Sequence, residues 1–277
     1  MYIDLLPTYL LSWKAYAVLA ICLVLEYAFY VYKRPLLTRE LAEDFVFAVF
    51  KRWVFLPAFL VYAALYKDFY EILFPPETWN LAREWPLGVQ LVVGYLAGDF
   101  MVFATHVMMH KVKPLWYFHA VHHSQKNINP LTTHRTHFIE DFIEDGIQFL
   151  PLAILGVGYS TWVAVRAFNW LWSHLIHSNI RWNFGPIGRV VVSPQYHRIH
   201  HSVAPEYYDC NFSARLVIWD QMFGTWCPRN DLYPTTGIPD PDYPKETSAH
   251  PLALLRQVVR QYVYPFRKLV AAYRTAY

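Results

Sequence analysis

The sequence has few of the groups that bind nucleic acid or build thiolate metal sites. Among 277 residues Lys and Arg number 24 and Asp and Glu 21, so no polybasic surface is predicted and nucleic-acid binding is disfavoured. Cys22, Cys210 and Cys227 are far apart and form no CxxC pair, which argues against thiolate zinc and iron–sulfur sites. We therefore expect reduced thiols, with a catalytic face in a reducing compartment.

Three common catalytic motifs are missing as well. The sequence has neither the HExxH helix of a zinc protease nor the GxSxG turn of a serine esterase. It also lacks the Glu-x-x-His motif of soluble-type di-iron bundles. Any metal chemistry must therefore use another arrangement of ligands.

Apolar and aromatic residues are abundant instead. Hydrophobic residues make up 55% of the chain and aromatic residues 18%, including 11 Trp and 21 Tyr. Trp and Tyr concentrate at the two faces of a bilayer, so this composition favours a membrane protein. Residues 1–14 lack the features of a cleavable signal peptide, and we expect the apolar stretch behind them to remain as a membrane helix.

Four apolar stretches are candidates for crossing or entering a hydrocarbon core about 30 Å thick. They occupy residues 9–32, 45–66, 87–110 and 146–177. Lys51 and Arg52 interrupt the second stretch. Pro151, with glycines at 156 and 158, divides the fourth into two helices or one hairpin.

We predict an all-α fold, an integral membrane helical bundle of about four transmembrane helices with a His-rich cytoplasmic helical cap. The predicted parts of this single domain, 1–277, are N-terminal membrane helices (1–110), a first cytoplasmic His-rich segment (111–145), a membrane hairpin (146–178), and a C-terminal cytoplasmic cap and surface helix (179–277). An even number of crossings would gather the basic residues on one side, and the positive-inside rule then places the histidines in the cytoplasm. The basic amphipathic tail is expected to lie on the membrane surface.

Eight of the 13 histidines fall into three groups. The groups are HxxxH at His106 and His110, HxxHH at His119, His122 and His123, and HxxHH at His197, His200 and His201. On a helix, each HxxHH can offer two ligands to one metal and one to a neighbouring metal. A single buried histidine is more often an ordinary core residue, but chance rarely produces three such groups in one chain. We therefore predict a two-metal site, for which imidazole alone would accept Zn, Cu, Fe or Ni.

Other polar residues are weaker candidates. His174 and His177 are predicted ligands because they lie i, i+3 near the end of an apolar stretch, whereas His134 and His137 are left open. Asp99 lies two helical turns before His106 and could hold an imidazole NH. The acidic stretch 140–145 is left unassigned, because a solvated helix start explains it equally well.

These residues resemble the fatty acid hydroxylase / sterol desaturase superfamily of membrane non-haem di-iron proteins. The resemblance covers roughly residues 99–226 and includes the three His groups in order, the PLWYF spacer at 114–118 and WDQMFGT at 219–225. Asn129 and Arg135 lie in a stretch similar to the one after the family's second box. The chain departs from the family at residues 211–213, NFS in place of Asn-Tyr-Gly, and at Val107 in place of Arg.

The resemblance implies two iron ions, O2 as oxidant, a hydrophobic lipid substrate and an external electron donor such as cytochrome b5 or ferredoxin. It implies an enzyme of the bacterial inner membrane or endoplasmic reticulum that hydroxylates or desaturates a C–H bond of a sterol, fatty acyl or ether lipid. The residues expected to support the ligands are Asp99, Asn129, Arg135 and Asp220. A zinc-dependent membrane hydrolase is the main alternative, and a metal-binding transporter is a further one.

Overall fold

The computed structural model describes residues 13–35, 37–51, 53–54, 84–155, 159–229, 231–245 and 248–276, with positions 61, 72 and 82. Over these residues the chain is helical and contains no strand, only three isolated backbone bridges. The all-α prediction is confirmed for this part of the chain.

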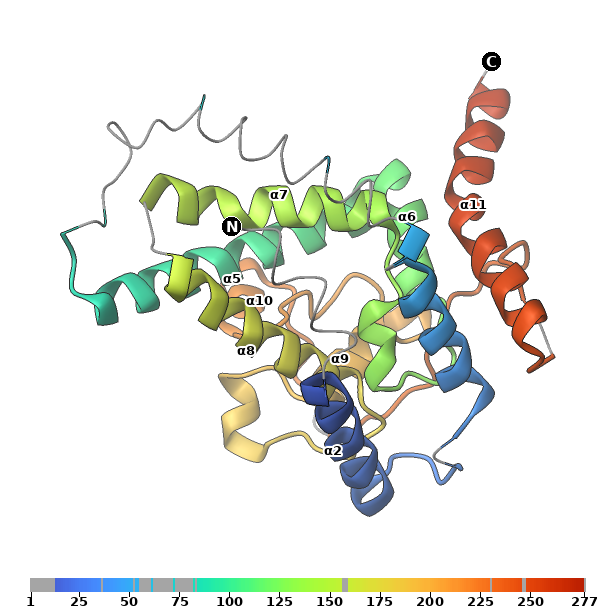
Figure 1. The fold of residues 1–277 in the computed structure, drawn as a ribbon, viewed down its shortest axis with the longest axis horizontal. Helices are drawn as coiled ribbons and strands as arrows, with labels where there is room; N and C mark the ends of the chain where they lie inside the picture. The colour runs from blue at the N-terminus through green and yellow to red at the C-terminus, as the bar shows by residue number, and fades with distance from the viewer. Residues whose placement is uncertain are drawn as a thin grey trace.

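Figure 1 shows the described helices in their chain order, with long loops on both sides of α10. The α-helices are α2 (Trp13–Phe29), α5 (Leu87–Lys111), α6 (Lys113–His123), α7 (Phe138–Leu155), α8 (Tyr159–His177), α9 (Pro194–His200), α10 (Ile218–Phe223) and α11 (Pro251–Ala276). Residues 39–51 are also helical. Short 3-10 helices are η1 (Pro130–His134), η2 (Gly185–Arg189) and η3 (Pro205–Tyr207).

Within the described residues, α5 alone is long and apolar enough to cross a membrane, and most of its apolar window is not covered by the rest of the protein. The apolar part of α2, Ala17–Phe29, is shorter. α7 begins eight residues before the predicted hairpin and carries Glu140 and Asp141 in its first turn. Residues 9–12, most of the predicted 45–66 span and the glycines at 156 and 158 lie outside the described residues. The four predicted crossings therefore stay a prediction.

A sharp bend joins α5 to α6. Val112 separates the two helices with extended backbone angles, φ −95° and ψ 104°. Pro114 lies in the first turn of α6, where its missing N–H costs no intrahelical hydrogen bond. The bend turns the end of α6 back toward the end of α5, so the histidines of the two helices meet.

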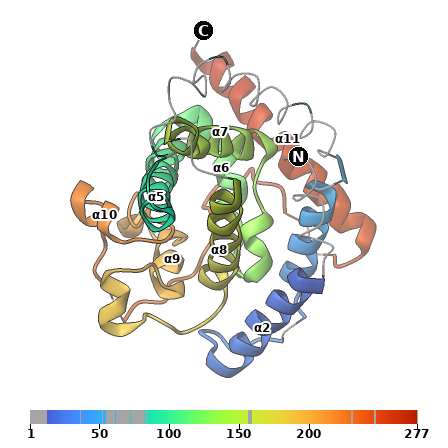
Figure 2. The same cartoon turned by 60° about the vertical axis from the view of Figure 1, so that its left-hand side comes forward.

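The remaining helices close around this pair (Figures 1 and 2). α7 packs along α5, α8 packs against η1 and α9, and α11 packs against α6. One buried cluster, Phe47, Val121, Val258 and Tyr262, joins the helix at 39–51 to α6 and α11. A second cluster joins the end of α8 to α9 through Ile176 and Tyr196. These contacts hold the ends of α5, α6, α8 and α9 against one another.

Candidate metal centre

Four helix ends supply the histidines of the candidate centre. His106 and His110 lie in the last turns of α5, and His177 ends α8. The HxxHH at residues 119–123 forms the last turn of α6. The second HxxHH spans α9 and its C-cap, and Ser193 begins α9 by accepting a hydrogen bond from the Tyr196 N–H.

The first set of converging side chains is termed here the five-histidine group. It consists of His106, His110, His119, His123 and His200, whose candidate ligand atoms all lie within 4.8 Å of one another. The Nε2 atom of His119 lies 3.1 Å from that of His106 and 3.0 Å from that of His123. The Nε2 atoms of His110 and His123 are 3.1 Å apart.

The second set is termed the four-histidine group. It consists of His122, His177, His197 and His201, again within 4.8 Å. The Nε2 atom of His177 lies 3.1 Å from that of His122 and 2.9 Å from that of His197. The His197 and His201 Nε2 atoms are 3.1 Å apart.

Each HxxHH segment gives two histidines to one group and one to the other, and the two segments favour different groups. α6 gives His119 and His123 to the five-histidine group and His122 to the four-histidine group. The second segment gives His197 and His201 to the four-histidine group and His200 to the five-histidine group. Residues four apart stack on one helix face, so each segment divides its three imidazoles two and one. The groups are adjacent, because the rings of His123 and His201 stack with centroids 4.3 Å apart.

Burial keeps these imidazoles neutral. Burial lowers the pKa of His119 to about 3. The pKa values of His122 and His201 also lie well below the ordinary value, first because of burial and then because of the neighbouring imidazoles. A neutral imidazole has one unprotonated nitrogen, which is the form that binds a metal.

The five-histidine group is oriented from outside by hydrogen bonds to its Nδ1 atoms. His106 Nδ1 lies 2.6 Å from the Phe212 carbonyl oxygen and His200 Nδ1 lies 2.9 Å from that of Cys210. His119 Nδ1 lies 2.6 Å from Glu140 Oε1, and both side chains are buried. A proton held on Nδ1 leaves the lone pair on Nε2, so three Nε2 lone pairs point into the group.

The four-histidine group has fewer outer partners. His177 Nδ1 lies 2.7 Å from the Ser173 carbonyl oxygen. The buried Nδ1 atoms of His122, His197 and His201 have no hydrogen-bond partner in the described part of the chain. The protein therefore fixes one tautomer by hydrogen bonding in this group and three in the other.

The spacing and chemistry of both groups fit a metal ion. Imidazole–metal bonds are about 2.0–2.1 Å long, so two bonds at a right angle place their nitrogens about 3 Å apart. The closest Nε2 pairs in both groups, at 2.9–3.1 Å, match that spacing. Hydrogen bonding does not explain the close contact of His106 with His119, because both rings use their single protons on Nδ1 and their two Nε2 lone pairs then face each other 3.1 Å apart.

The structure brings nine of the ten predicted ligands into the two groups and leaves His174 outside them. His174 Nε2 lies 3.2 Å from His134 Nε2, and its Nδ1 lies 2.7 Å from the Trp170 carbonyl oxygen. His137 Nδ1 accepts a hydrogen bond from Ile139 N–H at the start of α7, and its Nε2 faces the Tyr262 carbonyl. His134, His137 and His174 thus pack helices together around the centre.

The sequence suggested that Asp99 holds an imidazole NH, but in the structure its carboxylate contacts other groups. Its Oδ2 accepts hydrogen bonds from the Leu216 backbone N–H at 3.2 Å and Trp219 Nε1–H at 2.9 Å. Its Oδ1 lies 3.4 Å from Arg215. Spacing along one helix could not reveal that the segment at 215–219 contacts α5 and supplies the hydrogen-bond donors for this carboxylate.

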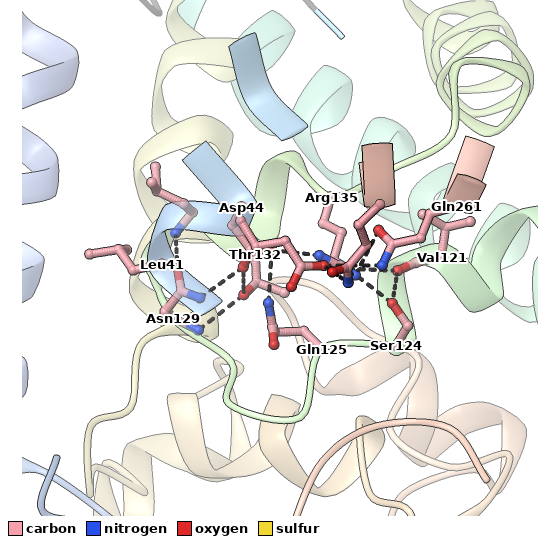
Figure 3. Close-up of polar contacts among 12 residues, drawn as sticks. Leu41, Asp44, Val121, Ser124, Gln125, Asn129, Thr132, Arg135 and Gln261 are labelled. Atoms are coloured by element: carbon pink, nitrogen blue, oxygen red, sulfur yellow. Dashed lines mark hydrogen bonds and ion pairs between the residues drawn. The ribbon is translucent and has the colours of Figure 1, made fainter. Parts of the chain in front are cut away.

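Arg135 lies in a buried polar network rather than against the imidazoles (Figure 3). Its guanidinium pairs with Glu43 at 2.8 Å and Asp44 at 2.9 Å. Its Nε donates to the carbonyl of Val121, which lies in the last turn of α6 between two box histidines. Arg135 thereby connects α6 to the helix at 39–51, and its contact with Gln261 extends the connection to α11.

Asn129 belongs to the same network. Its side chain donates to Asp44 at 2.8 Å and accepts from the Leu131 N–H, which begins η1. Thr132 also donates to Asp44 at 2.8 Å. Asn129 therefore fixes the loop between α6 and η1, and its side chain hydrogen-bonds to Asp44 and Leu131, not to the histidines.

Asp220 acts on the ligands through one intervening backbone segment. Its carboxylate accepts hydrogen bonds from the N–H groups of Phe212 and Ser213, from Thr225 Oγ1 and from the Tyr196 hydroxyl. The carbonyls of Cys210 and Phe212 in that segment orient His200 and His106. Asp220 thus supports two members of the five-histidine group.

Glu140 is a supporting residue that was not predicted from the sequence. The acidic stretch carries no predicted role, yet the Glu140 side chain is 1% exposed and contacts His119. Burial raises the pKa of Glu140 well above its ordinary value. The signal that could have indicated burial is the apolar setting, because Glu140 lies within FIEDFI at the start of an apolar helix.

Comparisons with known proteins agree with this geometry. The fatty acid hydroxylase family model matches residues 91–225, which include most of α5, all three His groups and α10. Residues 91–225 are a fatty acid hydroxylase domain. The domain contains both histidine groups, whereas α11 and the helix at 39–51 lie outside it.

Three curated relatives show the range of proteins similar to the fatty acid hydroxylase domain. Ornithine lipid hydroxylase OlsE of Rhizobium tropici is 32% identical over 143 residues, 52% of this chain and 43% of that protein. Alkylglycerol monooxygenase of Danio rerio is 31% identical over 170 residues, 61% of this chain and 36% of that protein. Delta(7)-sterol-C5(6)-desaturase of Nicotiana tabacum is 28% identical over 131 residues, 46% and 45% respectively. The chain thus spans less than half the length of each, and no solved structure matches significantly.

Proposed function

We propose that this chain is a membrane-bound, O2-dependent di-iron oxidoreductase that hydroxylates a C–H bond of a lipid. The observation that carries the proposal is the pair of adjacent histidine groups, with five and four converging imidazoles. Two ions would be held by neutral nitrogen ligands alone, in a fatty acid hydroxylase domain. A lone zinc hydrolase site would need only three or four protein ligands.

The roles of the residues follow from their positions. His106, His110, His119, His123 and His200 would hold one iron, and His122, His177, His197 and His201 the other. Bound iron would supply the redox chemistry with O2 that no side chain can perform. The protein's own groups orient the imidazoles, keep them unprotonated and exclude water by burial.

Hydroxylation is favoured over desaturation because the relatives at 31% identity and above are named hydroxylase or monooxygenase. Desaturation is the second candidate, since a sterol desaturase is also similar to the domain. The substrate class that fits the relatives best is a lipid with a polar head group. Hydroxylation consumes O2 and two electrons per oxygen inserted, so an external carrier such as cytochrome b5 or a ferredoxin would supply the electrons.

Membrane residence with a cytoplasmic catalytic side is part of the proposal. α5 is apolar, 25 residues long and largely uncovered, so it can cross the bilayer with its C-terminal end at one face. The centre lies at that end, close to Lys111 and Lys113, where the positive-inside rule predicts the cytoplasm. The bacterial inner membrane and the endoplasmic reticulum both satisfy this requirement.

Metal analysis and O2 uptake test the proposal. The purified chain should contain about two irons, and its O2 consumption should require both a reductant and lipid. Mass spectrometry of lipids from cells with and without the chain should show a gain of one oxygen, whereas a loss of two hydrogens would indicate desaturation. Zinc in both groups, with activity unchanged in anaerobic buffer, would refute the oxygenase and favour a hydrolase.

A further inference from the structure

The outward face of α11 is divided lengthwise into an apolar half and a basic half. The apolar half, termed the α11 stripe, consists of Leu252, Leu255, Val259, Val263, Phe266 and Val270, which are 40–65% exposed. The basic half consists of Arg256, Arg260, Arg267 and Arg274, all exposed. The helix contains no acidic residue.

Helical geometry explains the division. At about 100° per residue, the six stripe residues cover an arc of roughly 80°, and the four arginines lie along one edge of that arc. The opposite side of α11 is buried by Leu254, Val258, Gln261 and Tyr264, which pack on the body of the protein. The stripe is therefore not the packing face of the helix, and an exposed apolar surface of this length needs another partner.

The described residues offer the arginines of α11 no internal partner. In the described part of the chain, none of the four has a hydrogen bond or ion pair with a carboxylate, whereas nearby Lys268 pairs with Asp240 and Asp242. A basic edge without internal partners, beside an apolar stripe, complements a surface that presents anionic groups above an apolar layer.

The place of α11 in the fold agrees with such a surface. α11 packs on α6, which begins two residues after the end of α5. In both views α11 runs at a steep angle to α5 (Figures 1 and 2). A helix at a steep angle to a membrane span, at the level where that span ends, lies close to the plane of the bilayer surface.

We propose that α11 docks on the anionic head-group layer of the bilayer, with its stripe in the acyl boundary and its four arginines among the lipid phosphates. The partner that contacts the α11 stripe is an anionic lipid surface and not a soluble protein. This inference rests on the membrane residence proposed above and is independent of the metal chemistry.

Depth-dependent quenching in lipid nanodiscs, one full-length chain per disc, tests the proposal. A fluorescent amino acid introduced by stop-codon suppression replaces either Val270, on the stripe, or Ala271, which is exposed on the far side of the arginine edge. The discs contain phosphatidylcholine with or without phosphatidylglycerol, and their acyl chains are brominated to quench a buried fluorophore. In the anionic discs, quenching at position 270 should be severalfold stronger than at position 271.

The arginines are tested in the quadruple variant Arg256→Gln, Arg260→Gln, Arg267→Gln and Arg274→Gln. The contrast between positions 270 and 271 should fall in this variant and in phosphatidylcholine discs. The variant should retain the metal content of the parent chain, so a failure of the iron proposal would be visible separately. Equal quenching at both positions, or a contrast unaffected by lipid charge and by the four changes, would overturn the proposal. So would shielding of position 270 only by an acidic electron carrier or by a second copy.

Discussion

The five-histidine and four-histidine groups are built from the same kinds of helix end, yet they differ in what surrounds them. In the five-histidine group, His106, His119 and His200 are oriented by a carbonyl or a carboxylate. In the four-histidine group only His177 has such a partner within the described residues. Outer hydrogen bonds fix the tautomer and the ring orientation of a ligand. Under the proposed function, we therefore expect the five-histidine group to bind its ion more tightly than the four-histidine group binds its own.

Removing one ligand from each group gives the largest expected effect. His122→Ala leaves three imidazoles in the four-histidine group, whereas His200→Ala leaves four in the five-histidine group. Both variants should lose turnover, because the proposed reaction needs both ions. His122→Ala should lose one ion per chain and His200→Ala should retain more metal, as measured by elemental analysis. His250→Ala, at an exposed position, is the control. Equal metal loss in the two variants would contradict the expected difference in metal affinity between the two groups.

Acid should destabilise the metal-free protein strongly. The folded-state pKa values of His119, His122 and His201 lie below the unfolded value of about 6.5, so the unfolded chain binds protons that the folded chain does not. Each contributes stability that is present above pH 6.5 and is lost as the pH falls below it. For His119, with a folded-state pKa of about 3, the loss is about 2 kcal/mol at pH 5. The loss from His119 is a sizeable part of the stability of a typical domain, about 5–15 kcal/mol, and His122 and His201 add to it in the same direction.

Thermal unfolding of the metal-free chain at pH 8, 6.5 and 5 measures this effect. Imidazole NMR titration assigns it to one group or the other. If one group titrated with ordinary pKa values, the two groups would not be equally buried in solution.

Arg135→Gln should affect both groups alike, because Arg135 positions α6 and α6 supplies both. The change leaves Glu43 and Asp44 buried without their cation, which should cost about 3–5 kcal/mol in the free energy of unfolding. Chemical denaturation and metal content measure the two consequences. Arg39→Gln removes a more exposed partner of Glu43 and should cost far less. Selective loss of one ion in Arg135→Gln would contradict the inference that Arg135 supports both histidine groups through α6.

Glu140→Gln should act on the five-histidine group alone. The amide cannot stabilise the His119 Nδ1 proton as a carboxylate does, and losing such a partner typically lowers metal affinity about 10–100-fold. Competition with a chelator, followed for each ion, measures the change. Glu144→Gln, one turn further along α7, is the matched control. An unchanged affinity in Glu140→Gln would show that the His119 contact does not tune the site.

The sequence allowed the boxes to be predicted because their spacing is local. Residues four apart on one helix necessarily share a face, so His119 with His123 and His197 with His201 follow from sequence. Which box would share an ion with which could not be predicted, because it depends on the bend at Val112 and on how α9 meets α6.

The supporting residues were harder to predict for the same reason. Asp99 lies on the same helix as His106, yet its partners come from residues more than 110 positions away. Glu140 reaches His119 only because α7 packs beside α5 and α6. Contacts that depend on tertiary packing cannot be predicted from the local spacing of residues. Helix content and the all-α class can be predicted, because they depend on the local sequence of each helix.

The opposite division of the two HxxHH segments makes the separation of the two ions a property of single helical turns. His122 and His123 are sequence neighbours that belong to different histidine groups, and so are His200 and His201. If each group holds an ion, a movement of one ion would also move a ligand of the other, so the positions of the two ions would be coupled. A substrate or redox partner that displaced α6 or α9 would therefore retune both ions at once.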